Sequence, residues 1–291
     1  MKFVIGDLVT RKSYKHDVLF RIANISQKKA ILHGEYIRLK ADAPIRDIEK
    51  TEVRELKRWQ KKSKSKEEFS YRLFKQDYQL LEEKREFELT DGYTKKIDYF
   101  RLPTKVLHLD GDEHYLKKCI ELYERLGLMV HGLHIREQEM AHEIGTLLEK
   151  IQPDIVVLTG HDAYLANKGD KKDLRAYRHS KYFQEAVRNA RDVVPYVDDL
   201  VIFAGACQSH FESLIRAGAN FASSPGRRNI HALDPVYIAA KIAYTSFIKK
   251  VNLYDVTRNT LTGKEGMGGI ETRGLLRVGM PFIKDEEDLD A

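Results

Sequence analysis

Two short apolar runs, each followed by a reactive side chain, constrain the fold of this 291-residue chain more than any other feature. Residues 154–160 (DIVVLTG) lead into His161, and residues 200–206 (LVIFAGA) lead into Cys207. Both runs are short, rich in β-branched residues and bounded by helical stretches, which predicts buried central strands. Ligands of open parallel sheets bind where the carboxyl ends of the strands meet, so we expect His161 and Cys207 to share one site.

The chain from residue 101 onward alternates strand and helix patterns. The predicted strands lie at 105–110, 128–135, 154–160, 200–206 and 220–224, and the predicted helices at 112–126, 137–151, 180–193 and 234–247. A glycine-rich end forms loops around 270–273. Repeated βα units with short links predict an α/β domain over residues 100–291, a three-layer αβα sandwich with a mostly parallel sheet.

The first 99 residues divide into two regions of different character. Short alternating bursts at 7–11, 18–22, 30–33 and 36–39 predict a small SH3-like β-barrel over residues 1–44, a type of module that often docks partners. Residues 45–99 carry charges of both signs with apolar residues at helical spacing. We expect two helices forming an arm there, interrupted by the lysine run at 61–66, a solvated hinge open to cleavage.

Composition excludes several classes of protein. With 42% hydrophobic and 32% charged residues the chain is a soluble globular protein, and no apolar run approaches the roughly 20 residues of a membrane span. The N-terminus lacks an apolar secretory region, so we expect a cytoplasmic protein whose two cysteines are free thiols. Because 50 basic residues are interspersed with 44 acidic ones, nucleic acid is not an expected partner despite the net charge of +6.

The predicted site contains the groups that thiol catalysis requires. Cys207 follows a strand and precedes a helix, whose N-terminus favours the thiolate and lowers the thiol pKa. His161 is the natural general base because imidazole titrates near neutral pH. The oxyanion donors would be the Cys207 amide and a backbone N–H between Gly160 and Asp162. This chemistry needs neither a cofactor nor a metal.

The order of these residues resembles known peptidases. One apolar block ends in His161, and a second ends in Ala206-Cys207, 46 residues further along the chain. This arrangement resembles the caspase-like (clan CD) cysteine peptidases. Those enzymes have Gly where Asp162 stands. Over nearly its whole length the chain resembles the YabG family. The segments that carry this resemblance are 5–7, 11–14, 105–112, 159–164, 176–181 and 203–225.

The resemblance to YabG implies a sporulation-specific cysteine peptidase of the mother-cell compartment. It implies spore coat and cortex-associated proteins as substrates, cut after basic residues, chiefly Arg. An arginine substrate needs an acidic pocket. The candidate acids are Asp162, Asp110, Asp112 and Glu271. Self-cleavage, if it occurs, is expected in the arm at about residues 45–75, which is rich in Lys and Arg.

Two other readings stay open. Asp110, Asp112 and His161 could instead hold a metal in a hydrolase, since carboxylates and imidazoles are ordinary ligands. A coat-assembly scaffold that binds through the barrel is the non-enzyme alternative. His210 is the main rival base, and Cys119 falls on the apolar face of its helix, where a core role is expected.

Overall fold

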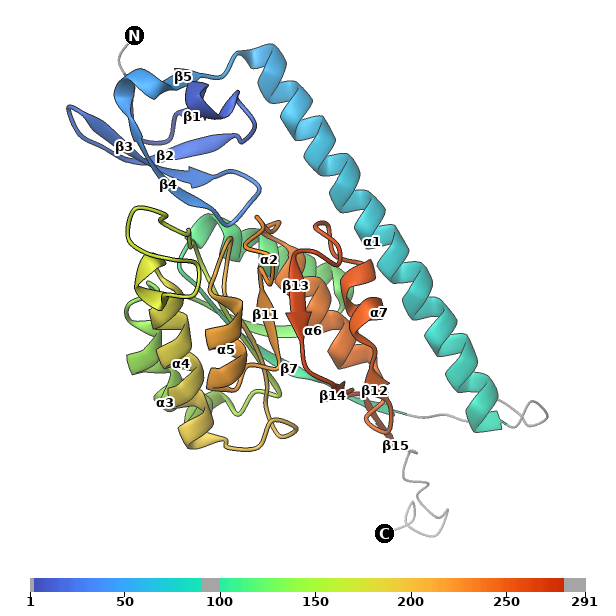
Figure 1. The fold of residues 1–291 in the computed structure, drawn as a ribbon. Coiled ribbons are helices and arrows are strands. Elements are labelled where there is room, and N and C mark those ends of the chain that lie inside the picture. Colours follow the sequence, from blue (N-terminus) through green and yellow to red (C-terminus); the bar gives the residue numbers. More distant parts are fainter. Residues whose placement is uncertain (1–2, 91–99, 280–291) are drawn as a thin grey trace, which may run out of the picture.

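A six-stranded sheet carries both apolar runs at its centre (Figure 1). The computed structural model describes residues 3–90 and 100–279. The strand order is β13-β11-β10-β9-β7-β8, with every neighbouring pair parallel except β11 and β13. The strands are β7 (Lys105–Asp110), β8 (Met129–His134), β9 (Ile155–Thr159), β10 (Val201–Ala204), β11 (Phe221–Ser223) and β13 (Met267–Gly269). The two runs form β9 and β10, which pair directly and are buried throughout.

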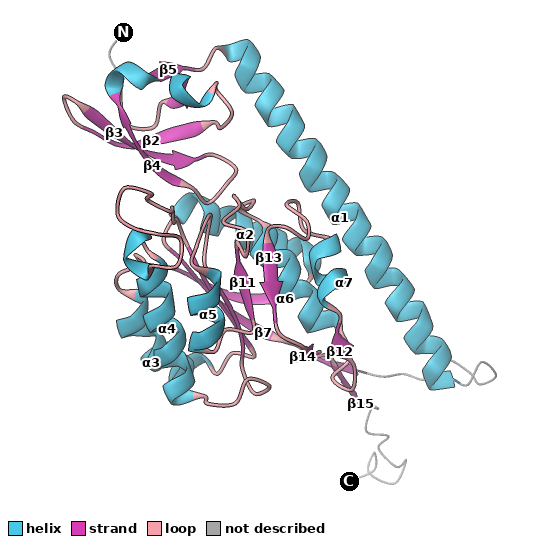
Figure 2. Ribbon diagram, in the orientation of Figure 1, coloured by secondary structure: helices cyan, strands magenta, loops and turns pink. Residues whose placement is uncertain are grey.

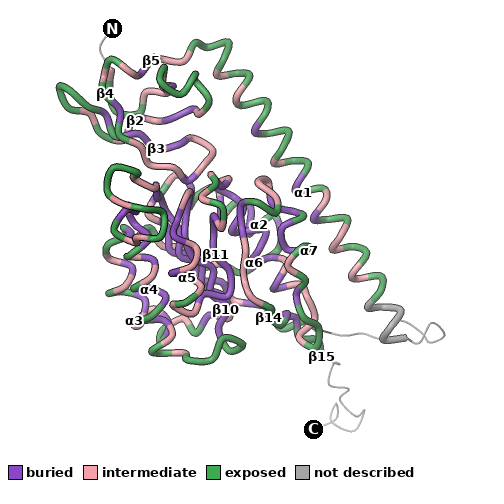
Figure 3. The backbone as a smooth tube through the Cα atoms, in the orientation of Figure 1, coloured by how far each residue is buried: buried purple, intermediate pink, exposed green. Residues whose placement is uncertain are grey.

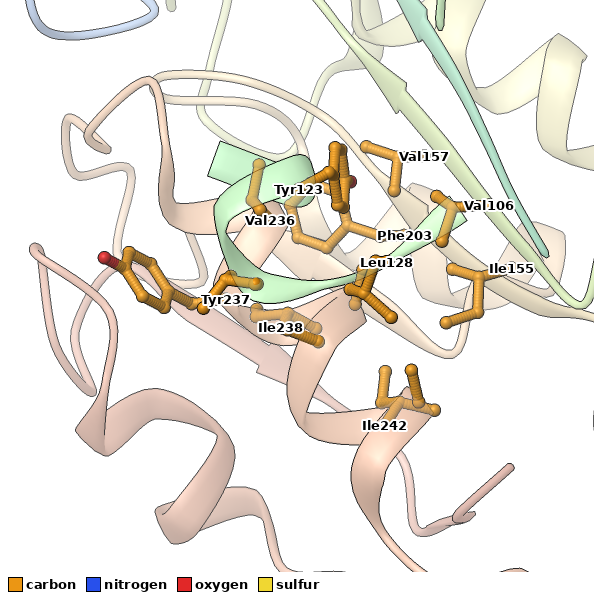
Figure 4. Close-up of a cluster of buried hydrophobic side chains, with 14 of the residues drawn as sticks. Val106, Tyr123, Leu128, Ile155, Val157, Phe203, Val236, Tyr237, Ile238 and Ile242 are labelled. Carbon is orange, nitrogen blue, oxygen red and sulfur yellow. The ribbon is translucent and has the colours of Figure 1, made fainter. Parts of the chain in front are cut away.

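Helices cover both faces of this sheet (Figure 2). They are α2 (Glu113–Leu126), α3 (Met140–Ile151), α4 (Ser180–Val193), α5 (Phe211–Ala217) and α6 (Asp234–Tyr244). Successive strand residues point to opposite faces, so Val157 packs with the core under α2 and α6, whereas Val156 and Leu158 pack with the core under α3, α4 and α5. Figure 4 shows Val157 near Tyr123 of α2. The α/β class with a largely parallel sheet is confirmed.

Five antiparallel strands form a separate N-terminal sheet. They are β1 (Leu8–Arg11), β2 (Phe20–Ile25), β3 (Lys29–Gly34), β4 (Lys40–Pro44) and β5 (Ile48–Lys50), in the order β4-β3-β2-β1-β5. This sheet has its own small core, centred on Phe20, Ile22 and Leu32. It lies next to the carboxyl edge of the six-stranded sheet (Figure 1).

The prediction of a strand at 36–39 is wrong. Residues 36–39, which we call the crossing segment, belong to no strand. They make isolated bridges, which reach across to the larger sheet's loops. These residues do alternate between apolar and polar, but they pair with loops of the larger sheet rather than with the N-terminal sheet. The fourth strand begins instead at Lys40, in a stretch whose only buried residue is Ala43.

A single helix, α1 (Val53–Thr90), replaces the two helices predicted for the arm. The lysine run at 61–66 continues the helix, because it contains no Gly or Pro and Lys is a good helix former. Figure 3 shows α1 largely exposed along the outside of the molecule. It is anchored by Phe74, which packs against Tyr237 and Tyr244. At 1.5 Å per residue its 38 residues span about 57 Å.

Short elements complete the structure. They are β6 (Phe100–Leu102), β12 (Lys250–Val251), β14 (Thr272–Arg273), β15 (Arg277–Gly279), α7 (Leu253–Arg258) and 3₁₀ turns at Lys12–Tyr14, Ile45–Asp47 and Leu174–Ala176. β6 pairs with β15 and β12 with β14, both antiparallel. Within residues 3–90 and 100–279, no helix has the length and apolar character needed to cross a membrane.

Candidate active site

His161 and Cys207 lie at the same edge of the six-stranded sheet. His161 is the second residue after β9, and Cys207 is the third after β10. Because β9 and β10 are parallel neighbours, both loops emerge on one side. Their side chains are almost completely buried, with exposed fractions of 1% and 0%. The crossing segment covers them.

The backbone of the crossing segment pairs with loops on both sides of the site. On one side Ile37 bridges His231 in antiparallel fashion, and the amide of Arg38 donates to the carbonyl of Ile230 at 3.2 Å. On the other side Leu39 bridges Asp162 in parallel fashion. The segment is therefore held by main-chain hydrogen bonds, as an added strand would be.

The carbonyl oxygen of Arg38 receives two backbone hydrogen bonds. The Cys207 amide donates at 3.2 Å and the Asp162 amide at 3.3 Å. Two converging amides are the arrangement that stabilises a developing oxyanion. They are the two predicted donors. Gly160, the third residue named for this role, packs against Glu137, where an added Cβ would lie 2.5 Å from the carboxylate.

The Arg38 side chain fills a closed pocket beneath its backbone and is 0% exposed. Nη1 donates to Asp110 Oδ2 at 2.8 Å, whereas Nε and Nη2 both donate to the carbonyl of Ala232, at 3.0 and 2.8 Å. The ring of Tyr115 lies 5.1 Å away, and Cys119 Sγ accepts from Nη2 at 3.4 Å. Burial opposes the charge of Asp110, but the guanidinium holds the pKa of that carboxyl below its usual range.

The Cys207 thiol contacts Ile230, the residue whose carbonyl also accepts from the Arg38 amide of the crossing segment. Sγ accepts from the Ile230 amide at 3.2 Å and lies 3.5 Å from its carbonyl oxygen. Burial raises the thiol pKa well above its usual value, although the Ile230 amide acts in the opposite direction. The predicted lowering by a helix N-terminus is absent because α5 begins only at Phe211 and the site is closed to water.

The His161 imidazole is sandwiched among aromatic and acidic groups. Its ring centre lies 3.8 Å from that of His33 and 5.2 Å from that of Tyr115, and Nε2 lies 3.5 Å from Asp112 Oδ2. Burial, followed by the nearby His33, lowers the pKa of His161 to about 3. The ring is therefore neutral at pH 7, which is the form that accepts a proton.

The other acids predicted to bind arginine have different surroundings. Asp112 caps α2 by accepting from two backbone amides of its first turn. The Asp162 carboxylate accepts from the amides of Ala163 and His179 and from the hydroxyls of Ser180 and Ser209. Glu271 is exposed and pairs with a surface lysine. Of these four acids, Asp110 is the one that contacts a guanidinium within the described part of the chain.

Glu137 and His33 are site residues that the sequence reasoning missed. Glu137 Oε1 accepts from the His161 amide at 2.9 Å, and His179 Nδ1 donates to the His161 carbonyl at 2.6 Å. His179 Nδ1 also lies 3.3 Å from Glu137 Oε1, and this contact is the main influence that overcomes burial and lowers the pKa of Glu137 to about 2. The signal for Glu137 was present, because it follows β8 as His161 follows β9. His210, the rival base, caps α5 instead, accepting from the Ser213 amide.

Two groups of side chains could hold a cation in the described residues. His33, Asp112 and His161 offer ligand atoms within 4.8 Å of one another, and so do His108, Asp110 and Cys119. The predicted set of Asp110, Asp112 and His161 is thus divided between two clusters. Arg38 occupies the second cluster, since its guanidinium contacts both Asp110 and Cys119.

Comparison with known proteins agrees with the peptidase reading. The family model described as YabG peptidase U57 matches residues 4–281. The sporulation-specific protease YabG of Bacillus subtilis (strain 168) is 56% identical over 287 residues, a match that covers 97% of this chain and 99% of that protein. No solved structure matches the chain.

Proposed function

Because the chain belongs to the YabG peptidase U57 family, we propose that it is a cysteine endopeptidase that cuts after arginine. Cys207 is the nucleophile and His161 the general base. The observation that supports this is the bound carbonyl of Arg38, which accepts from the amides of Cys207 and Asp162 while its side chain reaches Asp110. An oxyanion site and an arginine pocket therefore adjoin the same thiol.

The proposed reaction is acyl transfer through a thioester. His161 takes the thiol proton as the sulfur of Cys207 bonds to the carbonyl carbon, and the two amides stabilise the oxygen that becomes negative. The C–N bond then breaks, and His161 gives its proton to the departing amine. Water hydrolyses the thioester, again with His161 as base, and restores the thiol.

The pocket favours arginine over lysine. Its acceptors engage three different guanidinium nitrogens, with Nη1 on Asp110 and with Nε and Nη2 on the Ala232 carbonyl. A lysine ammonium has one nitrogen and cannot reach both acceptors in this planar geometry. Asp162, whose carboxylate already accepts four hydrogen bonds, then serves to hold the His161 and Cys207 loops together rather than to bind substrate.

The wider biological role follows from the same family. We infer that the natural substrates are proteins of the spore coat and cortex machinery, met in the mother-cell compartment of a sporulating cell. We propose that the N-terminal sheet is an SH3-like barrel that docks such partners and that extends past residue 44 to include β5 (Ile48–Lys50). The arm that joins it to a caspase-like αβα domain over 100–291 then begins after β5.

The deciding experiment compares variants on a protein substrate that contains arginine. Cys207→Ala and His161→Ala should each lose several orders of magnitude in rate while remaining folded. Cys119→Ala, which removes the other thiol, should retain measurable cleavage. A fully active Cys207→Ala protein would refute the thiol mechanism.

A metal hydrolase is the second candidate, supported by the His33, Asp112 and His161 cluster. A chelator would abolish its activity and an alkylating agent would not, whereas a cysteine peptidase responds in the opposite way. A non-enzymatic scaffold would show no cleavage in any of these assays.

A further inference from the structure

We propose that the crossing segment is the enzyme's own first substrate, and that Cys207 cuts the bond between Arg38 and Leu39 within the same chain. This inference rests on the proposed function, because it uses the same nucleophile and the same arginine pocket. It adds a specific processing site and a reason for the closed state of the active site.

The main chain around Arg38 is held in the way a substrate would be. Residues before the bond pair with one loop, where the Ala232 amide donates to Tyr36 and the Arg38 amide donates to Ile230. The residue after the bond bridges Asp162 on the opposite loop. The carbonyl of the bond to be cut lies between them, on the two oxyanion donors.

The burial of the Arg38 side chain also indicates a bound substrate residue. Arginine is rarely buried completely unless its charge is paired, and this one makes its polar contacts with the larger sheet's side of the molecule. Its partners Asp110 and Ala232 belong to the larger sheet and to the loop before α6. The N-terminal sheet therefore presents Arg38 to a pocket that is built elsewhere.

The same contacts explain why the site is closed. His161 and Cys207 are almost completely buried with the crossing segment in place. Another protein cannot place its arginine on Asp110 while Arg38 occupies that carboxylate. Intact chains are thus inhibited by their own bound segment, and cutting it is the step that frees the site.

The cleavage step follows the proposed mechanism and consumes one water. The sulfur of Cys207 bonds to the Arg38 carbonyl carbon while His161 takes the thiol proton. The bond to Leu39 breaks, and the Leu39 nitrogen leaves as an amine with that proton. Water then releases residues 1–38 with a carboxylate on Arg38 and restores the thiol.

The fold allows this loop to move once it is cut. The crossing segment lies in the short connection between β3, which ends at Gly34, and β4, which begins at Lys40. The β3 and β4 strands pair over five residues without it, from Lys29↔Pro44 to His33↔Lys40. The cut ends can leave the edge of the large sheet while the N-terminal sheet stays assembled.

The proposed position differs from the self-cleavage region predicted at about 45–75. Much of that region belongs to α1, and a site that pairs with an extended chain cannot accept a helix without unwinding it. Arg46, the first arginine of the region, is exposed on a 3₁₀ turn. It provides a matched control.

The test measures intact mass and N-terminal sequence during incubation of purified full-length protein, with a separate arginine peptide cleaved in parallel. Wild type should yield residues 1–38 and a new N-terminus beginning Leu39-Lys40-Ala41. Cys207→Ala and Arg38→Gln should yield neither, and Arg46→Gln should cut as wild type does. The rate constant should not change over a hundredfold dilution, because the reaction is within one chain.

The possible failures can be told apart. Wild type that cleaves the peptide but stays joined at Arg38 overturns this inference and leaves the proposed function standing. Wild type that cleaves neither overturns both. If Arg38→Gln does not fold, Cys207→Ala provides the uncut control, because it is a small change that leaves the crossing segment bound. If added wild type cuts the Cys207→Ala chain at Leu39 as fast as it cuts itself, cleavage within one chain is refuted.

Discussion

Replacing Asp110 by asparagine tests the arginine pocket directly. The carboxylate makes a 2.8 Å hydrogen bond to Arg38 Nη1, with both side chains fully buried. Asparagine keeps the size and one acceptor oxygen but removes the negative charge. The change therefore isolates the charged part of the interaction.

The expected size follows from the strength of a buried hydrogen bond between charged groups, about 1.5–3 kcal/mol. Since about 1.4 kcal/mol corresponds to a factor of ten, the preference for arginine over glutamine before the cut bond should fall about 10- to 150-fold. The change should come from weaker cleavage of the arginine substrate. Cleavage of the glutamine substrate should hardly change.

The assay measures kcat/KM for two peptides that differ only in that residue. Asp47→Asn is a matched control, because Asp47 pairs with Arg11 at 2.9 Å on the N-terminal sheet, and its selectivity ratio should equal that of wild type. An Asp110→Asn enzyme that is folded and keeps the full ratio would refute the assignment of the pocket. If Glu271→Gln lost the preference instead, the pocket would lie at the C-terminal loops.

Three further changes test the surroundings of His161 and Cys207, the proposed catalytic pair. Ser209→Ala removes a hydroxyl that donates to Asp162, so kcat should fall by less than the about 100-fold of a deleted oxyanion donor, with KM nearly constant in steady-state kinetics. Glu137 has its pKa lowered to about 2 from 4.5, so its carboxylate stabilises the fold above about pH 4.5 and this contribution is lost as the pH falls towards 2. The difference in urea midpoint between wild type and Glu137→Gln should therefore shrink over that range; a constant difference would contradict it. Gly160→Ala places a Cβ 2.5 Å from a carboxylate oxygen and should destabilise the protein by about 1–3 kcal/mol. Gly145→Ala, on a helix where the new Cβ would make only an ordinary contact with Val193 at 3.8 Å, should stabilise the protein in thermal melts.

Local pattern predicted the centre of the fold well. β9 and β10 could be recognised because continuous apolar runs of this length, between helical stretches, have few other uses. Their parallel pairing then brought the loops of His161 and Cys207 to one edge. The pattern also led to the Cys207 and Asp162 amides, which share one carbonyl oxygen in the structure.

The crossing segment could not be predicted in the same way. Residues 36–39 alternate as a strand does, and the sequence does not reveal which backbone they pair with. The partner is a loop about 190 residues away, at His231. The prediction of a hinge at the lysine run of the arm was wrong for a related reason. A run of charged residues indicates exposure to solvent but does not end a helix.

Site residues that come from the N-terminal sheet could not be predicted from the ends of the βα strands either. His33 lies on β3, far from the βα units, yet its ring stacks on His161. The packing of the N-terminal sheet against the loops of the larger sheet determines this contact. In contrast, Glu137 follows the rule that found His161 and could have been included.

The way the N-terminal core is divided along the chain has a further consequence. Of its buried residues, those before the crossing segment are Val9, Phe20, Ile22, Ala30 and Leu32, whereas Ala43 and Ile48 follow it. After a cut at Arg38, most of this core would belong to a peptide held only by non-covalent contacts. Two remaining strands cannot keep a stable sheet in water. The 38-residue peptide would then act as a ligand for the rest of the N-terminal sheet. Its loss on dilution would unfold that sheet, and an added synthetic copy of the peptide would restore it.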